Sequence, residues 1–578
     1  MPFQLSPGVA VVEKDFSAIV PAVSSSAGAF AGVFPWGPVL DPVTITSENV
    51  LVQRFGKPTD SNFDSFFTAA NFLAYTNNLL VVRVDTADAK NAVSAGTAVK
   101  IKNFDQYSTS YAGGQGTVGE WAAKYPGALG NSLKVSMADS QTFTGWTYEA
   151  EFDSAPSTST FAASVGSTND EIHVIVIDED GLWTGTQGAI LEKFSYVSKA
   201  SNAVKSDGTN NYYKNVINSQ SKYIWWMDHT TAVTTTVAGL GTSGVAWGID
   251  ALNNGFKDLT GAVNKSLTGG VDDLAATDGE LQAGFAIFAN AEQYDISLIP
   301  VGKVSETVAE YVINNVAEVR LDCVAFISPQ YIVGNTSGGT DGDVIQGAPI
   351  SDMVDALNEY RNELPSSSYA VLDSGSKYQY DRYNDKYRFV PLNGDIAGLC
   401  ARTDFTNDPW WSPGGLNRGQ VKNVVRLAVN PGKTERDNLY SNGVNPVVNF
   451  PGQGTVLFGD KTLQSRPSAF DRINVRRLFI VLEKAIATAA KYQLFEFNDS
   501  FTRAQFKNLI EPFLRDVQGR RGVTDFRVKC DDTNNTGEVI DRNEFVADIF
   551  IKPNRSINFI TLNFIAARSS VSFTEIGA

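Results

Sequence analysis

The sequence predicts a multidomain protein of mixed α/β and α+β class, in which a β-rich region is inserted into an α/β unit. The chain has 578 residues and is 43% hydrophobic, which is enough for about three to five folded domains at roughly 150 residues each. Residues 28–85 alternate strand and helix patterns, residues 88–345 are rich in Gly, Ser, Thr, Asn and Asp with short β-branched runs, and the last third begins with two helical patterns.

The first α/β segment is predicted from its apolar spacing. The string GAFAGVFPWGPV, from residue 28, is an apolar strand that Pro35 and Gly37 terminate. Thr46 to Phe55 has the pattern of a capped helix, and Phe63 to Leu73 carries apolar residues at helical spacing. The string LLVVRV, residues 79–84, is then expected as a buried strand.

The middle region, residues 88–345, is predicted to be mostly β with an interposed α/β piece. The clearest strand is EIHVIVIDEDG, from residue 171, which ends in a turn of acidic residues. Two further buried strands, ISLIPVG and CVAFISP, flank an expected helix from Ser305 to Arg320.

The last third combines two helices with several strands. Helices are expected over 473–492 and 501–518, the second bent or restarted at Pro512. Three strands follow in the strings DFRVKC, EFVADIFIKP and NFITLNFIA, and the last is apolar at both alternating positions, as expected for a strand covered on both faces.

Charge and cysteine content exclude several functional classes. The formal net charge of −16 disfavours direct binding to nucleic acid or to an anionic membrane surface. The three cysteines are far apart in the chain, so neither a disulfide framework nor a zinc ribbon is expected. No secretion signal and no membrane span is apparent, and synthesis in a cytoplasm is expected.

No catalytic, cofactor or metal site is predicted. His173 lies in a strand pattern and His229 in a turn, and neither has a nucleophile motif nearby. The glycine-rich string at 114–119 lacks the strand and helix that a phosphate cradle requires. The alternative class is a glycan hydrolase carried on a virion, for which Asp178 and Asp180 are the paired acids.

Basic charge is concentrated in residues 466–529, which contain 13 Lys and Arg against 7 Asp and Glu. Within the second helix the cations flank an apolar face, so this surface is either solvated or the contact for an acidic protein partner. The cations expected to form it are Arg503, Lys507, Arg515, Arg520 and Arg521.

Both chain ends are apolar and β-prone, whereas free termini are normally polar. Such ends either complete the protein's own sheet or add a strand to a neighbour's sheet, which would give a head-to-tail assembly. The residues expected to form these arms are Phe3, Leu5, Val9, Val11, Ile557, Phe559, Leu562 and Phe564.

Several long strings resemble the contractile tail sheath proteins of T-even-like myophages, members of the phage tail sheath family. They are LSPGVAVVE near the start, KYQYDRYNDKYRFVPLNGDIAGLCARTD at 377–404, WWSPGGLNRGQ at 410–420, FDRINVRRLF at 470–479 and CDDTNNTGEVIDRNEFVADIFIKPNRSINFITLNFIA at 530–566. The resemblance is dense from about 370 to 566, clear over 1–85 and patchy between. The departure from the family lies in 88–345.

The resemblance implies nested domains around a sheath-type α/β core. Residues 1–20 with 466–578 would form the inner domain nearest the tail tube, 21–87 with 346–465 a middle α/β domain, and 88–345 an outer β-rich region of one or two subdomains. It also implies β-augmentation between subunits by the terminal arms, and contact between an inner-domain helix and the tube, for which 501–518 is the candidate.

The implied function is that of a structural subunit of a contractile phage tail sheath, not an enzyme. Subunits would polymerise helically around the tail tube in an extended metastable state and contract to drive the tube through the host envelope during genome delivery. The expected partners are further copies of the chain, the tail tube protein, and the baseplate and tail terminator proteins. The expected location is the virion tail, after assembly in the host bacterial cytoplasm. The alternative is the sheath of a secretion or bacteriocin-like contractile machine.

Overall fold

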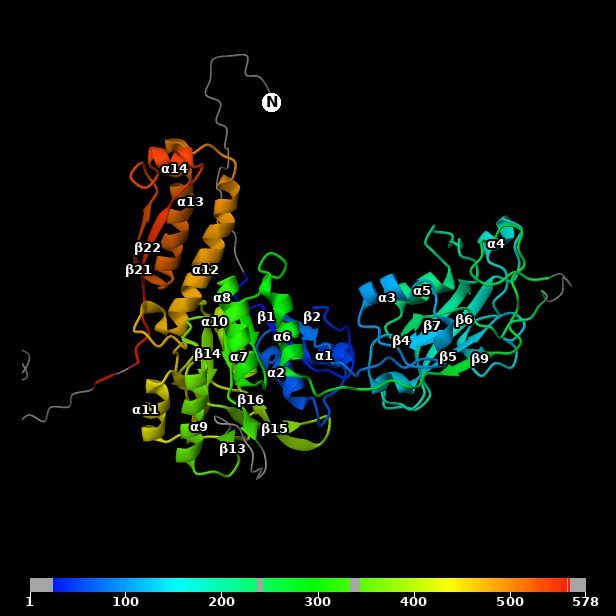
Figure 1. The fold of residues 1–578 in the computed structure, drawn as a ribbon, viewed down its shortest axis with the longest axis horizontal. Coiled ribbons are helices and arrows are strands. Elements are labelled where there is room, and N and C mark those ends of the chain that lie inside the picture. Colours follow the sequence, from blue (N-terminus) through cyan, green and yellow to red (C-terminus); the bar gives the residue numbers. More distant parts are fainter. Residues whose placement is uncertain (1–23, 236, 238–242, 333–343, 559, 562–578) are drawn as a thin grey trace, which may run out of the picture.

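A computed structural model describes residues 24–235, 237, 243–332, 344–558 and 560–561. The molecule has an α/β body, a β-rich lobe at one end and a helical hairpin that extends from the body (Figure 1). Two connecting segments join the body to the lobe. Over the described residues, no helix is long and apolar enough to cross a bilayer.

The body is built on a seven-stranded sheet in the order β18-β14-β11-β10-β1-β3-β2. All neighbouring strands are parallel except the antiparallel pair β2 and β3. The strands are β1 (Gly28–Gly32), β2 (Val43–Ile45), β3 (Leu79–Arg83), β10 (Leu298–Pro300), β11 (Val324–Ile327), β14 (Ala370–Asp373) and β18 (Val444–Asn445).

Alternate side chains of this sheet pack into two apolar clusters, one on each face. On β1, Ala29 and Ala31 belong to one cluster and Phe30 to the other. Both faces are therefore covered, as is usual for parallel sheets. The body helices are α1 (Glu48–Phe55), α2 (Phe63–Leu73), α6 (Asp278–Ala286), α7 (Glu306–Val312), α8 (Glu318–Arg320), α9 (Ile350–Glu363), α10 (Asn393–Thr406) and α11 (Lys433–Ser441).

The last part of the range 88–345, which is expected to project outward, contributes strands to the central sheet. Strands β10 and β11 pair with β1 and β14 inside the central sheet, because their continuous apolar runs need neighbours on both sides. The expected helix from Ser305 to Arg320 runs between these strands, and a π-helical segment, Ile313–Ala317, separates α7 from α8.

The β-rich lobe contains a four-stranded antiparallel sheet in the order β7-β6-β5-β9 and a two-stranded sheet of β4 and β8. Its strands are β4 (Trp121–Ala123), β5 (Leu133–Ala138), β6 (Glu171–Asp178), β7 (Ala189–Ser198), β8 (Ile224–Trp226) and β9 (Val263–Ser266). Short helices α3 (Phe104–Ser110), α4 (Thr160–Ser164) and α5 (Tyr213–Gln220) accompany them. Trp36, four residues after the end of β1, meets Trp183 of the lobe edge-on at 4.8 Å between ring centroids.

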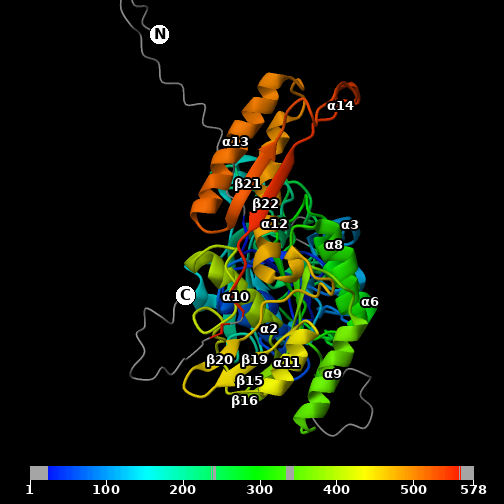
Figure 2. The same cartoon turned by 90° about the vertical axis from the view of Figure 1, so that its left-hand side faces the viewer.

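The helical hairpin consists of α12 (Ile473–Ala490) and α13 (Ser500–Gly519), followed by the antiparallel pair β21 (Val523–Lys529) and β22 (Asp548–Pro553), with α14 (Gly537–Asp541) between these strands. α12 and α13 run side by side away from the body (Figure 2). α13 continues through Pro512, so the helix does not restart there. Of the nine residues of the third expected strand, NFITLNFIA, six lie outside the described residues.

Three smaller sheets complete the body. One joins β15 (Ser376–Asp381) to β16 (Lys386–Pro391) and β17 (Arg426–Leu427), another joins β19 (Val447–Phe450) to β20 (Gly454–Leu457), and the third joins β12 (Tyr331–Ile332) to β13 (Val344–Ile345).

Candidate functional site

The hairpin α12–α13 and the strands after it form one small core. On α13 the residues Phe506, Ile510, Leu514 and Val517 recur every three or four positions and are buried. They pack with Leu478 and Leu482 of α12 and with Val528 of β21. The apolar face of α13 is thereby buried inside the hairpin. Only the remaining faces of the helix can contact other molecules.

The five predicted cations do not share one free surface. Arg503 is buried, and its guanidinium donates to the carboxylate of Asp532 and to the side-chain oxygen of Asn498 at 2.9 Å. The sequence pattern placed Arg503 at the edge of the apolar face but carried no sign of Asp532, which lies 29 residues away. The Arg503 side chain therefore stabilises the hairpin core and is not exposed at the surface.

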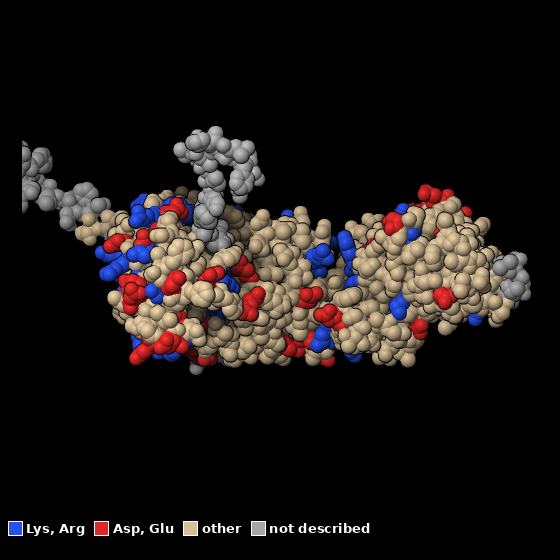
Figure 3. Space-filling model, turned by 90° about the horizontal axis from the view of Figure 1, so that it is seen from above, with Lys and Arg blue, Asp and Glu red and all other residues tan. Residues whose placement is uncertain are grey.

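Lys507 and Arg515 lie on the exposed side of α13 and share Glu511. The Lys507 ammonium is 3.6 Å from that carboxylate and the Arg515 guanidinium 3.9 Å. A polar hollow of about 440 Å³ lies beside them, between α13 and β21, and Asp525, Arg527 and Lys529 also line it. Figure 3 shows basic and acidic side chains intermixed over the end of the molecule that carries the hairpin. This surface therefore carries both cations and carboxylates, which form local ion pairs.

Arg520 and Arg521 lie at the far end of α13, next to two indole rings. Arg520 pairs with Asp516 and Asp408 at 2.9 and 2.8 Å, and its guanidinium lies 5.1 Å from the Trp410 ring. Arg521 has a left-handed backbone with φ of 67° and lies 5.3 Å from the Trp411 ring. Arg520 and Arg521 thus lie on a different surface from Lys507 and Arg515.

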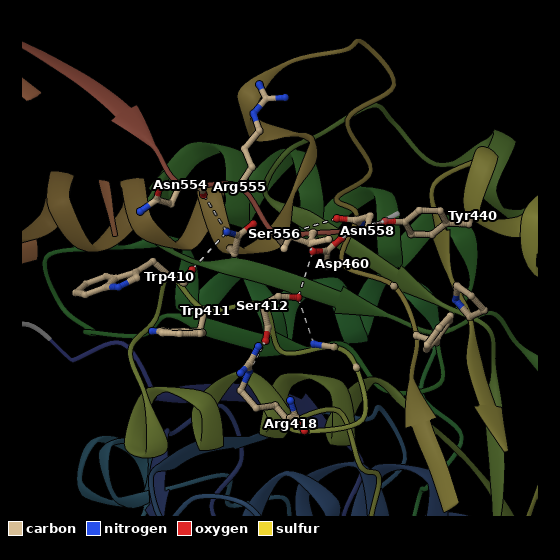
Figure 4. A pocket seen from close by; sticks show the side chains of 18 of the residues that line it. Trp410, Trp411, Ser412, Arg418, Tyr440, Asp460, Asn554, Arg555, Ser556 and Asn558 are labelled. Carbon is tan, nitrogen blue, oxygen red and sulfur yellow. Dashed lines mark hydrogen bonds between the residues drawn. The ribbon is translucent and has the colours of Figure 1, made fainter. Parts of the chain in front are cut away.

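That surface borders a pocket of about 900 Å³ at the base of the hairpin, which we call the Asp460 pocket. Its walls come from the loop after α10, from α11, from the first turn of α12 and from the segment after β22 (Figure 4). Asp460 is nearly buried, and its carboxylate accepts hydrogen bonds from Ser412 at 3.2 Å, Tyr440 at 3.1 Å, Ser556 at 2.6 Å and Asn558 at 3.0 Å.

Asp460 therefore fixes the point from which the C-terminal segment leaves the body. Both Ser556 and Asn558 belong to that segment, and the side chain of Ile557 between them is 82% exposed. The sequence pattern did not reveal this hub, because its members are spread from 412 to 558. Of the predicted arm residues, Ile557 is described, whereas Phe3, Leu5, Val9, Val11, Phe559, Leu562 and Phe564 lie outside the described residues.

The residues considered for chemistry have structural partners. Asp178 accepts hydrogen bonds from Ser132 and from Thr184 at the β6–β7 turn; burial acts to raise its pKa, but these hydrogen bonds hold it below the usual value. His173 stacks on Phe152 at 4.1 Å between ring centroids. His229 lies 2.6 Å from the Tyr213 hydroxyl, and burial lowers its pKa to about 4. Among the described residues, no group of three potential metal ligands comes together.

Comparison with known proteins gives one consistent answer. Three family models match: the N-terminal region of domain III of tail sheath protein Gp18 at 29–84, the phage tail sheath protein central domain at 275–463, and the phage tail sheath C-terminal domain at 465–567. The chain is 36% identical to the tail sheath protein of Vibrio phage KVP40, over 99% of both chains. It is 32% identical to the tail sheath protein of Enterobacteria phage T4, over 99% of both chains.

Two solved structures share the fold at low identity. A sheath tail protein from Listeria innocua matches with a TM-score of 0.52 and 11% identity, covering 92% of this chain and 96% of its own. The helical sheath of the anti-feeding prophage, solved in its contracted state, matches with a TM-score of 0.51 and 12% identity, covering 98% and 100%.

Proposed function

From the premise that this chain belongs to the phage tail sheath protein family, we propose how its described surfaces serve a sheath. The chain is a structural subunit of a contractile tail sheath and a component of the virion tail. In our proposal the subunits polymerise helically around the tail tube in an extended, metastable state. Contraction then drives the tube through the host envelope during genome delivery, after assembly in the host cytoplasm.

The proposed division of labour follows the order of the chain. Residues 1–20 with 466–578 form the inner, tube-proximal domain, and 21–87 with 346–465 form the middle domain. The segment from α6 to β11 joins this middle domain, because β10 and β11 lie in its sheet. The β-rich lobe, up to β9, is the outer part. Support comes from the hairpin's separate core and from the single sheet shared by β1, β3 and the later strands.

The terminal arms act as strands that tether neighbouring subunits. Within the described residues, β21 and β22 pair only with each other, so each has one edge with unpaired backbone groups. Such edges are templates for added strands. The apolar residues of both chain ends supply suitable strands, and the Asp460 hub holds the start of the C-terminal arm.

The tube contact lies on the exposed side of α13, at Lys507 and Arg515. Their side chains are 44% and 73% exposed, and their ion pairs with Glu511 are of the kind that contributes about 0–1 kcal/mol. A partner carboxylate can replace Glu511 at little cost. The contact is then weak and sensitive to salt, which suits a sheath that must release the tube. Baseplate and tail terminator proteins are the further partners in this proposal.

The observation that carries the function is similarity to tail sheath proteins along 99% of the chain. The test is electron microscopy of the purified full chain over a concentration series, alone and with purified tail tube. Hollow, helically striated tubes are expected. If only uniform small particles are found at every concentration, with and without tail tube, the proposal is wrong.

A further inference from the structure

We propose that the loop joining α12 to α13 in one subunit inserts its aromatic side chains into the Asp460 pocket of a second copy of this chain. The inference rests on the proposed function, because it names one of the contacts that would hold copies together in a sheath. Its evidence is a protruding apolar loop, a pocket of matching character and the placement of the two at opposite ends of one hairpin.

The loop exposes more apolar surface than a solvated turn normally does. Five large side chains in and beside it are mostly exposed: Tyr492 at 73%, Leu494 at 63%, Phe495 at 104%, Phe497 at 85% and Phe501 at 74%. Phe495 has a left-handed backbone with φ of 69°, which is uncommon for an aromatic residue. Contiguous exposed apolar patches of this kind mark interaction sites. Since the side chains protrude, they suit insertion into a hollow.

The Asp460 pocket offers such a hollow. Its lining includes the rings of Trp410, Trp411 and Phe458 together with Pro446. A volume of about 900 Å³ lies at the upper end of the range of about 300–1,000 Å³ for pockets that enclose drug-sized molecules. Two phenyl rings from a loop therefore fit inside it, and aromatic residues of this kind commonly anchor protein interfaces.

The charges of the two surfaces are opposite. The pocket is lined by five cations, Arg418, Lys433, Arg436, Arg521 and Arg555, against the carboxylates of Asp437 and Asp460. In the part of the chain that the structure describes, none of these five cations forms a salt bridge, while Asp460 is already bonded to four side chains and to Arg472. The loop carries Glu496 and Asp499 and no cation between residues 492 and 501. These opposite charges favour contact between a loop and a pocket, whereas the like charges of two loops disfavour contact between loops.

The positions of the loop and the pocket in the subunit determine which kind of assembly their contact produces. α12 begins at the pocket, where Asn474 lines it, and ends at the loop after Ala490. α13 starts at the loop with Ser500 and returns to the pocket at Arg521. Helices of this length span roughly 27–30 Å. A subunit cannot fill its own pocket across that distance, and a contact between opposite ends of one rod is heterologous, so it propagates along a line of subunits.

Cysteine cross-linking in the full chain tests the contact directly. The natural cysteines Cys323, Cys400 and Cys530 are buried, so background reaction is expected to be low. Phe497→Cys places a thiol in the loop, and Asn417→Cys places one at the pocket. Under mild oxidation, the double variant is expected to form a ladder of linked multimers, whereas a mixture of the two single variants forms only dimers. Dimers of Phe497→Cys alone would show that loops meet each other, and would overturn the inference.

Assembly measurements supply an independent test. Phe495→Ser with Phe497→Ser is expected to raise the concentration needed for tube formation at least about tenfold, since two buried aromatic anchors are lost. The matched control, Leu182→Ser with Leu252→Ser, removes two exposed apolar side chains of the outer lobe, 54% and 62% exposed, and is expected to leave that concentration unchanged. Equal effects of both pairs, or no effect of the loop pair, would overturn the inference.

A charge exchange identifies the partner surface. Glu496→Lys and Arg555→Glu are each expected to weaken assembly severalfold, and the combination is expected to restore it. If the loop variants form tubes normally and only fail to bind added tail tube, the loop's partner is the tube protein and the inference is wrong. Failure of the unaltered chain to form tubes, with or without tail tube, counts instead against the proposed function and all that rests on it.

Discussion

The hairpin is joined to the body by a buried ion pair, and removing one partner should loosen the hairpin strongly. The Arg477 guanidinium on α12 lies 2.6 Å from the Asp404 carboxylate on α10, and both side chains are at most 6% exposed. The same guanidinium donates to the carbonyls of Cys400 and Ser25 at 3.3 and 3.2 Å. Asp404→Ala would leave this cation buried without its carboxylate.

Breaking a buried pair in this way costs about 3–5 kcal/mol, which corresponds to a factor of at least about 100 in a local opening equilibrium. Hydrogen exchange is the suitable measurement, because it reports the local opening of α12. A global free energy of unfolding would not serve, since a multidomain chain does not unfold in a two-state manner. Amide protection in α12 should fall by that factor, while protection in β6 of the outer lobe stays unchanged. Asp60→Ala is the matched control: Asp60 is 67% exposed and pairs with Lys386 and with Arg388, and Arg388 keeps a second carboxylate, Asp381, so the loss is expected to be about 0–1 kcal/mol.

Two results would refute this reasoning. One is unchanged α12 protection in Asp404→Ala, and the other is an effect no larger than that of Asp60→Ala. The double variant Asp404→Leu with Arg477→Met sharpens the test, because replacing a buried ion pair by apolar side chains of similar size is often neutral or stabilising. Protection in α12 should then return towards that of the unaltered chain.

Three further predictions concern assembly and pH. Deleting residues 1–14 should give folded monomers that do not polymerise, and long tubes of this variant in the electron microscope would contradict the role of the arms. Lys507→Glu with Arg515→Glu should weaken binding to purified tail tube in a sedimentation assay, most clearly at low salt, while Leu182→Ser with Leu252→Ser should not; unchanged binding would remove this face of α13 from the contact. The outer lobe should lose stability as pH falls from about 6.5 to about 4, because His229 is protonated near its ordinary pKa when unfolded but only at about 4 when folded. Hydrogen exchange in β6 and β7 should show this loss, and His229→Gln should reduce it.

Local patterns in the sequence predicted several of the helices well, although α6, α9, α10 and α11 were not predicted. The expected helix from Phe63 to Leu73 has those bounds in the structure, and the expected helix 501–518 is found as α13, Ser500–Gly519. In both cases apolar residues recur at helical spacing over three or more turns, and a strong periodic signal of that length depends little on the rest of the chain. A polar residue, Asn62 or Asp499, precedes each helix.

Long-range partners could not be predicted in the same way. The apolar runs of β10 and β11 show that these strands are buried, but they do not identify β1 and β14 as neighbours. Arg503 had a surface-like position in the helical pattern, and only the fold brings Asp532 to it. The exposed aromatic loop between α12 and α13 could have been predicted from the sequence. Its residues lie between two helical patterns, where a polar turn is expected, and an apolar run there is unusual.

The contacts between parts of the subunit bear on where the work of contraction arises. The hairpin is held to the body by the buried pair of Arg477 and Asp404 and by the Trp410 indole, which donates to the Arg520 carbonyl at 3.0 Å. At the other end of the body, the buried Arg83 guanidinium donates to the carbonyls of Gly37 and Pro126 at 3.1 and 2.8 Å, which ties the segment after β4 of the lobe to β3.

A hinge at either junction would have to expose or unpair a buried guanidinium, at a cost of several kcal/mol in each subunit. Contacts between subunits offer a less costly path, because exposed ion pairs such as those of Lys507 and Arg515 exchange partners for about 0–1 kcal/mol. We therefore propose that the subunit moves as one body while its faces repack, and that the C-terminal arm proposed above, anchored by Ser556 at the Asp460 hub, keeps neighbours connected during that motion. In this account the free energy released on contraction comes from new contacts between subunits, and each subunit need contribute only a small share of it.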